Sequence, residues 1–158
     1  MYTAEQRTVL LRLARESIER HLAGRPLPGC PLPDPALEEK RGVFVTLRKD
    51  GDLRGCIGQI LPVFPLWRAV REMAVESATG DPRFPPVTAR ELRQIRIEIS
   101  VLTVPKRVVS ADEIVLGRDG VIVRQGLRSG VFLPQVAAET GWSKEEFLNY
   151  LCSHKAGL

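Results

Sequence analysis

The chain has 158 residues, 44% hydrophobic and 27% charged, enough to bury a core as one domain or as two packed lobes. Its net charge is only +4 and no stretch concentrates the basic residues, which argues against a nucleic-acid-binding surface. Most basic residues are arginine, so the composition is compatible with a small anionic ligand as a partner.

Three scattered cysteines and two histidines argue against a disulfide framework and a zinc site, and we expect neither a metal nor a cofactor. With no leader-like or membrane-length apolar segment, we expect a cytoplasmic protein that does not enter a membrane.

The first forty residues predict a helix followed by an extended connector. Thr3 and Gln6 have the spacing of a helix-capping box, and apolar residues recur at helical intervals until Gly24, where the helix should end. Residues 25–36 contain five prolines, which are excluded from helix interiors and central strands. This stretch should therefore be a connector without regular structure.

Two strands joined by a tight turn are predicted after the connector. Residues 42–48 and 53–58 have strand-like sequences, and the Asp-Gly pair between them is a strong signal for a two-residue hairpin turn. Residues 65–79 carry an apolar stripe at helical spacing, and residues 95–102 alternate apolar and polar side chains. We therefore expect a second helix and a third, half-buried strand.

The remaining residues predict a second hairpin and two further helices. The hairpin should use residues 121–125 and 131–133, with glycines at its turn. Pro134 should begin a helix that ends near Gly141, and Ser143 should cap the next one. Because strands occur as hairpins and do not alternate strictly with helices, the pattern favours an α+β fold with a mostly antiparallel sheet flanked by helices.

Four unusual segments, in this order, resemble the AMMECR family. They are Leu53-Arg54-Gly55-Cys56-Ile57-Gly58, Asp81-Pro82-Arg83-Phe84-Pro85-Pro86-Val87, Gly130-Val131-Phe132-Leu133-Pro134-Gln135-Val136, and Leu151-Cys152 with Lys155-Ala156-Gly157-Leu158. The first of them matches the family's LRGCIG hallmark at every position. The resemblance implies a single domain of the AmmeMemoRadiSam system protein A type over residues 1–158, with a larger and a smaller lobe. It also implies a pathway shared with a Memo-like protein and a radical S-adenosylmethionine protein, and a biochemical activity that is not settled.

Cys56 is the candidate nucleophile. Arg54 lies two residues away on the same predicted strand, so its guanidinium could favour the thiolate, and Gly55 and Gly58 would let a ligand approach closely. The expected hairpin register argues the other way. A two-residue turn would place Cys56 opposite Val45 on an apolar face, and we therefore favour a structural cysteine over a reactive one.

That register follows from pairing Arg48 with Leu53 and Leu47 with Arg54 across the turn. A loop one residue longer would place Cys56 opposite Phe44 instead, which is equally apolar. Either arrangement would bury the thiol. Reactive cysteines need partial exposure, so both alternatives weaken the nucleophile hypothesis.

Arg54 should be partly buried at the turn end of the apolar face. A buried guanidinium needs an anion, either a carboxylate such as Asp81 or Glu98 or the carboxylate or phosphate of a ligand. We favour the internal ion pair. The residues around Arg54 are compatible with either an internal carboxylate or a ligand anion.

The proline-rich loop of residues 81–86 is the other candidate for a binding element. Its stiffness could present Asp81 and Arg83 to a cleft whose floor is the strand from Arg54 to Gly58. It could equally be a rigid connector whose Phe84 fills the core. The two interpretations carry similar weight.

Three functions follow from these residues. The first is a substrate-binding or partner-binding component of the pathway implied by the resemblance, using the strand from Arg54 to Gly58 with Asp81, Arg83 and Phe84. The second is an enzyme acting on a small anionic molecule through Cys56 or through Asp81 and Arg83. The third and weakest is a nucleic-acid-binding or adaptor domain.

Overall fold

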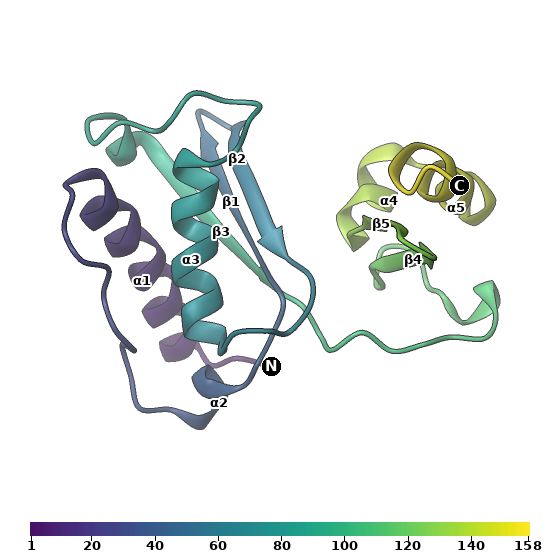
Figure 1. Cartoon of the computed structure of the whole chain (residues 1–158), viewed down its shortest axis with the longest axis horizontal. Coiled ribbons are helices and arrows are strands. Elements are labelled where there is room, and N and C mark those ends of the chain that lie inside the picture. Colours follow the sequence, from purple (N-terminus) through teal and green to yellow (C-terminus); the bar gives the residue numbers. More distant parts are fainter. The chain divides into compact units, whose positions relative to one another are not determined.

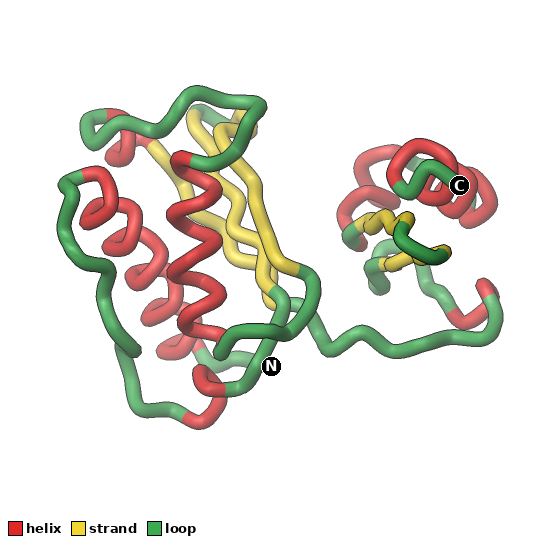
Figure 2. Tube along the Cα trace, in the orientation of Figure 1, coloured by secondary structure: helices red, strands yellow, loops and turns green.

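The structure is a computed structural model that describes residues 1–158, and the chain forms two compact units, Met1–Pro105 and Lys106–Leu158 (Figures 1 and 2). Helices and antiparallel strands make up both units, so the predicted α+β class with a larger and a smaller lobe is confirmed. A single family-type domain over residues 1–158 stays a prediction. None of the helices combines the length and the apolar character that crossing a membrane would require.

The larger unit packs two long helices against one face of a three-stranded antiparallel sheet (Figure 1). Its elements are α1 (Ala4–Leu22), α2 (Pro35–Glu38), β1 (Val43–Lys49), β2 (Asp52–Gln59), α3 (Leu66–Thr79), the short 3₁₀ turn η1 (Glu91–Gln94) and β3 (Ile95–Val101). The strand order is β2-β1-β3, so β1 is central and the other two strands form the edges.

Hydrogen bonds from nearby side chains determine where the helices α1 and α2 begin. The capping box at the start of α1 is present as predicted, with the Thr3 hydroxyl accepting the Gln6 N–H at 3.1 Å. The connector prediction is wrong at its C-terminal end, where α2 begins at Pro35. The cause is Asp34, whose carboxylate accepts the Ala36 N–H at 2.9 Å and caps a single helical turn.

The hairpin turn forms as predicted, but the register beyond it does not. Asp50 and Gly51 both have positive φ, 52° and 83°, as a type I′ turn requires, and Arg48 pairs with Leu53. A bulge follows immediately, so Leu47 pairs with Gly55 and not with Arg54. Arg54 is the extra residue, and every later partner on β2 is shifted by one position.

The core of the larger unit lies between the sheet and the two long helices. Val43, Val45 and Leu47 of β1 are completely buried there, with α1 and α3 above them. The alternate residues Phe44 and Thr46 lie on the opposite face, which no helix of this unit covers (Figure 1), and are half-buried. We call this opposite side the outer face of the sheet.

The smaller unit is a two-stranded hairpin packed against short helices. Its elements are η2 (Ala111–Glu113), β4 (Val121–Gln125), β5 (Arg128–Phe132), α4 (Pro134–Thr140), α5 (Lys144–Tyr150) and the π-helical turn η3 (Leu151–Lys155). β5 begins three residues before its predicted start because the turn occupies only Gly126 and Leu127. Phe132, Phe147 and Leu151 form a core of their own.

Candidate functional site

The proline-rich loop closes onto the free edge of β2. Cys56 directs its backbone N–H and C=O away from β1, and both are bound by loop side chains. Asp81 Oδ2 accepts the Cys56 N–H at 3.0 Å, and Arg83 Nη2 donates to the Cys56 carbonyl at 3.2 Å. Arg83 also binds both oxygens of Asp81, at 3.0 and 2.7 Å. Cys56, Asp81 and Arg83 thus form one hydrogen-bonded group, which we call the edge clamp.

The edge clamp holds a buried negative charge and a half-exposed positive one. The side chain of Asp81 is 1% exposed, whereas that of Arg83 is 55% exposed. The guanidinium of Arg83 is the main reason that the pKa of Asp81 lies well below its usual range, and the Cys56 N–H adds to this against the cost of burial. Asp81 is therefore ionised under all ordinary conditions.

Arg83 keeps one group available to a ligand. Its Nε and Nη2 are bound to Asp81 and Cys56, which leaves Nη1 as its remaining donor nitrogen. The guanidinium also lies over the ring of Phe84, with Cζ 5.5 Å from the ring centroid. Phe84 is half-buried beside Arg83, so the loop combines a fixed cation with an aromatic surface.

Cys56 lies on the outer face of the sheet and not in the core. Its cross-strand partner is Thr46, so the expected pairings with Val45 or Phe44 are both wrong, and the bulge at Arg54 is the reason. Its Sγ shares a hydrogen bond of 3.2 Å with Thr46 Oγ1 and makes no other. The thiol is half-buried, and no histidine or carboxylate is bonded to it as a general base.

Arg54 forms an internal ion pair, but with neither of the partners expected from the sequence. Its Nε and Nη2 donate to the two carboxylate oxygens of Glu91, at 2.7 and 3.2 Å, and Lys49 Nζ lies 3.2 Å from the same carboxylate. Both side chains of the pair are mostly buried, 13% and 14% exposed. The hydrogen bond from Arg54 lowers the pKa of Glu91 to about 2. The prediction of Asp81 or Glu98 is wrong because η1 brings Glu91 to this end of the sheet.

The two glycines of the hallmark strand allow close packing within the protein. A Cβ at Gly55 would overlap the backbone carbonyl of Ser77 on α3, so only glycine permits this helix to approach the strand. A Cβ at Gly58 would overlap the ring of Phe44, which covers that position on the outer face. Both glycines are therefore accounted for by internal contacts.

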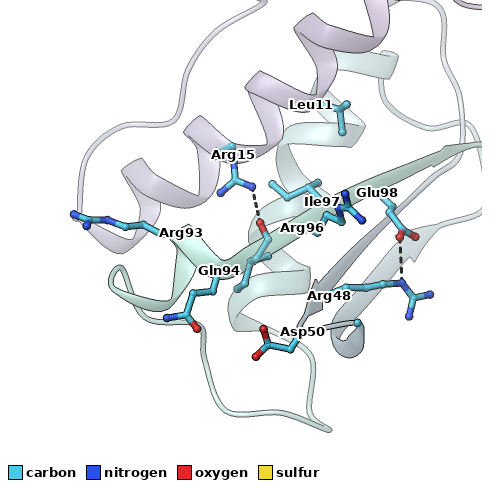
Figure 3. Close-up of a pocket in the computed structure, with 11 residues that line it drawn as sticks. Leu11, Arg15, Arg48, Asp50, Arg93, Gln94, Arg96, Ile97 and Glu98 are labelled. Atoms are coloured by element: carbon cyan, nitrogen blue, oxygen red, sulfur yellow. Dashed lines mark hydrogen bonds and ion pairs between the residues drawn. The ribbon is translucent and has the colours of Figure 1, made fainter.

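A second cluster of charged residues, which the sequence did not single out, surrounds a pocket of about 590 Å³ beside β3 (Figure 3). Arg15 reaches from α1 to the carbonyl oxygens of Leu92 and Ile95, at 2.9 and 2.7 Å. Arg48 pairs with Glu98 at 3.1 Å. Arg93 and Arg96 also line the pocket, and both are exposed. These arginines come from three separate segments, so no local motif could have indicated the cluster.

No group of three or more histidine, cysteine, aspartate or glutamate side chains has an arrangement that could hold a metal ion. Cys30, Cys56 and Cys152 are all free thiols, and Cys30 is exposed. Cys56 is the one thiol of the edge clamp.

Comparison with known proteins identifies the family. Protein MK0488 of Methanopyrus kandleri is 49% identical over 166 aligned residues, which cover 99% of this chain and 79% of that protein. A protein of Methanothermobacter thermautotrophicus is 51% identical, over 94% of this chain and 81% of its own length. The crystal structure of the uncharacterized protein PH0010 from Pyrococcus horikoshii matches with a TM-score of 0.86 and 45% identity, over 94% of this chain and 78% of that one. The AMMECR1 family model matches residues 11–158, and the chain therefore belongs to the AMMECR1 family.

Proposed function

We propose that this protein is the binding component of a pathway that also contains a Memo-like protein and a radical S-adenosylmethionine protein. In this role it holds a substrate or a partner protein at the edge clamp and the adjoining outer face of the sheet. The binding residues are Asp81, Arg83 and Phe84 of the loop, which Cys56 holds in place through its backbone groups. The other residues of the hallmark strand, Arg54, Gly55 and Gly58, fix the shape of this site through internal contacts. The group recognised carries negative charge, either as a small anionic ligand or as a carboxylate on a partner.

The observation that carries this proposal is the double hydrogen bond of the loop to Cys56. Asp81 and Arg83 bind both backbone groups of one residue, which fixes the loop to the strand before any ligand arrives. The fixed Arg83 then presents Nη1 beside the Phe84 ring. A preformed cation next to an aromatic surface is suited to a carboxylate or phosphate, because little side-chain entropy remains to be lost on binding.

An enzyme acting through Cys56, or through Asp81 and Arg83, has less support. The Cys56 thiol has only the Thr46 hydroxyl as a hydrogen-bond partner, and a hydroxyl is too weak a base to activate it. Asp81 is buried and held in its ionised form by Arg83, so it is unsuited to exchange protons near neutral pH. Asp81 and Arg83 stabilise each other and the edge of β2.

Binding measurements on purified proteins test the proposal. The chain would be titrated with the Memo-like protein and the radical S-adenosylmethionine protein of the same organism, using calorimetry. We expect at least one of them to bind, and Arg83→Ala to weaken that binding by about tenfold or more, as for a charged residue at the centre of an interface. Arg118→Ala is the matched control, because Arg118 forms a comparable short pair with Asp119 at an exposed site.

Two results would count against the binding role. One is unchanged affinity in the Arg83→Ala variant while its unfolding temperature stays near that of the wild type. The other is turnover of a small molecule from extracts of the host that Cys56→Ser abolishes, which would favour the enzyme. Cys56→Ser keeps a hydrogen bond to Thr46 available and should leave partner binding intact.

A further inference from the structure

The proline-rich loop of residues 81–86 is anchored at both ends and exposed between them. At its start the side chain of Asp81 is buried in the edge clamp. At its end the next residue, Val87, is buried and donates its N–H to the Ala78 carbonyl of α3 at 2.8 Å. Four of the five residues between these anchors are exposed: Pro82, Arg83, Pro85 and Pro86. The loop is therefore fixed to the larger unit at two points and presents its middle to a partner.

The backbone of this loop has little conformational freedom left to lose on binding. The Asp81 side chain accepts the Arg83 N–H at 3.1 Å, and the Asp81 carbonyl accepts the Phe84 N–H at 3.2 Å. The first four residues therefore form a tight turn with proline at its second position, which is the position that proline favours. Phe84 and Pro85 each precede a proline, which restricts both to extended conformations. The loop is thus a turn followed by a short stretch of polyproline type.

An exposed loop of this kind is poorly suited to a small ligand. Small molecules bind in clefts that enclose most of their surface, and the pockets of about 590, 490 and 480 Å³ in the larger unit are not lined by any residue of the loop. An anion at Arg83 would meet one free nitrogen, Nη1, on a side chain that is 55% exposed. Such a contact is screened by water and contributes little on its own. A protein partner gains more, because it can also cover the neighbouring apolar side chains.

The exposed groups of the loop are complementary to an aromatic groove that carries a carboxylate. Proline-rich segments of polyproline type dock into grooves lined by aromatic side chains, because their shape is already formed before binding. Three prolines and Phe84 supply the apolar surface of the loop, and Arg83 is the only charged residue between positions 82 and 86. Prolines have no N–H, so the loop offers mainly carbonyl oxygens, to which tryptophan and tyrosine side chains can donate. A carboxylate beside such a groove would complement the Arg83 guanidinium.

We propose that the loop inserts into an aromatic-lined groove of a partner protein, with a carboxylate at the edge of that groove bound to Arg83 Nη1. Such a contact rests on the binding role proposed for the edge clamp, and it makes the recognised group a protein surface and not a small anion. This chain then supplies the inserted segment and the partner supplies the groove. The hydrogen bonds of Asp81 and Arg83 to Cys56 hold the loop in the shape that inserts.

Calorimetric titration of the full chain with the Memo-like protein and the radical S-adenosylmethionine protein of the same organism provides the first test. We expect the double variant Pro85→Ala with Pro86→Ala to weaken binding of the partner by about tenfold or more, because it removes both apolar surface and stiffness. The matched control is Pro31→Ala with Pro33→Ala, since these prolines are also exposed but lie on the connector. The control should keep the wild-type affinity, and both variants should unfold near the wild-type temperature.

A photo-crosslink identifies the chemistry of the groove directly. Pro86→p-benzoylphenylalanine places the reactive group on an exposed position of the loop, and Pro31→p-benzoylphenylalanine places it on the connector as a control. We expect crosslinks to the partner from position 86 and not from position 31. The crosslinked partner peptide, identified by mass spectrometry, should contain aromatic residues together with aspartate or glutamate. This measurement keeps the test decisive if the double proline variant fails to fold.

Several outcomes would overturn the proposal, and they separate its failure from that of the binding role. If neither protein binds, both are wrong. If Arg83→Ala weakens binding and the double proline variant does not, the binding role stands and insertion of the loop is refuted. Competition by about 1 mM inorganic phosphate, beyond that of sodium chloride at equal ionic strength, would make Arg83 a small-anion site. A crosslink from position 86 within the free chain would show that the chain itself covers the loop.

Discussion

The ion pair of Arg54 with Glu91 should respond unequally to the loss of its two partners. Glu91→Gln removes the charge shared by Arg54 and Lys49, and it leaves a guanidinium that is 13% exposed without a counter-charge. Removing one partner of a buried pair costs about 3–5 kcal/mol. The folded pKa of Glu91 leads to a similar value, because a carboxyl whose pKa falls from 4.5 to about 2 on folding contributes about 3 kcal/mol near neutral pH.

Arg54→Met should cost less, about 1–2 kcal/mol, because Glu91 keeps Lys49 and the Thr88 N–H as partners. The free energy of unfolding would be measured by urea titration at pH 7, with Trp67 as the fluorescent probe. A Trp142→Phe background confines the signal to the larger unit, which contains Trp67.

The pair of Arg48 with Glu98 supplies the control, because its side chains are 36% and 51% exposed. Glu98→Gln should therefore change the free energy of unfolding by less than about 1 kcal/mol. If Arg54→Met costs as much as Glu91→Gln, the shared-carboxylate explanation is wrong. A Glu98→Gln variant as unstable as Glu91→Gln would show that burial does not determine the difference.

Three further predictions concern the larger unit. Gly55→Ala should destabilise it by about 2 kcal/mol or more through overlap with the Ser77 carbonyl, whereas Gly29→Ala, which meets no neighbouring atom, should be neutral in the same urea titration. Ser77→Ala should cost about 1–3 kcal/mol, since its buried hydroxyl bonds to β1 and β2. Stability should fall as pH drops below about 4, because Asp81 and Glu91 have lowered pKa values in the folded state, and Asp81→Asn should flatten this dependence in thermal unfolding.

Features set by neighbouring residues could be predicted from the sequence. The Asp50-Gly51 turn forms with the expected positive φ values, and the predicted helix caps at Thr3 and at Ser143 are both present. In each case the interacting groups lie within three residues of one another. Their geometry depends on short-range sterics and hydrogen bonds, which a sequence pattern states directly.

The candidate site was harder to predict because its geometry depends on distant contacts. The bulge at Arg54 is invisible in the alternation of β2, and it alone moves Cys56 from the core to the outer face. The carboxylate partner of Arg54 is 37 residues away in the chain, on a 3₁₀ turn. Grouping the hallmark strand with Asp81 and Arg83 needed the family resemblance, since no local rule links segments 25 residues apart.

Each of the two units is built from one uninterrupted stretch of chain with its own apolar cluster. During synthesis, all residues of the first core are therefore joined to the growing chain before the second hairpin is made. The three strands of the larger unit all lie within residues 43–101, so they can pair with one another while the second hairpin is still being translated. Synthesis from the N-terminus therefore shortens the time during which unfolded apolar side chains of the larger unit can contact those of the incomplete smaller unit.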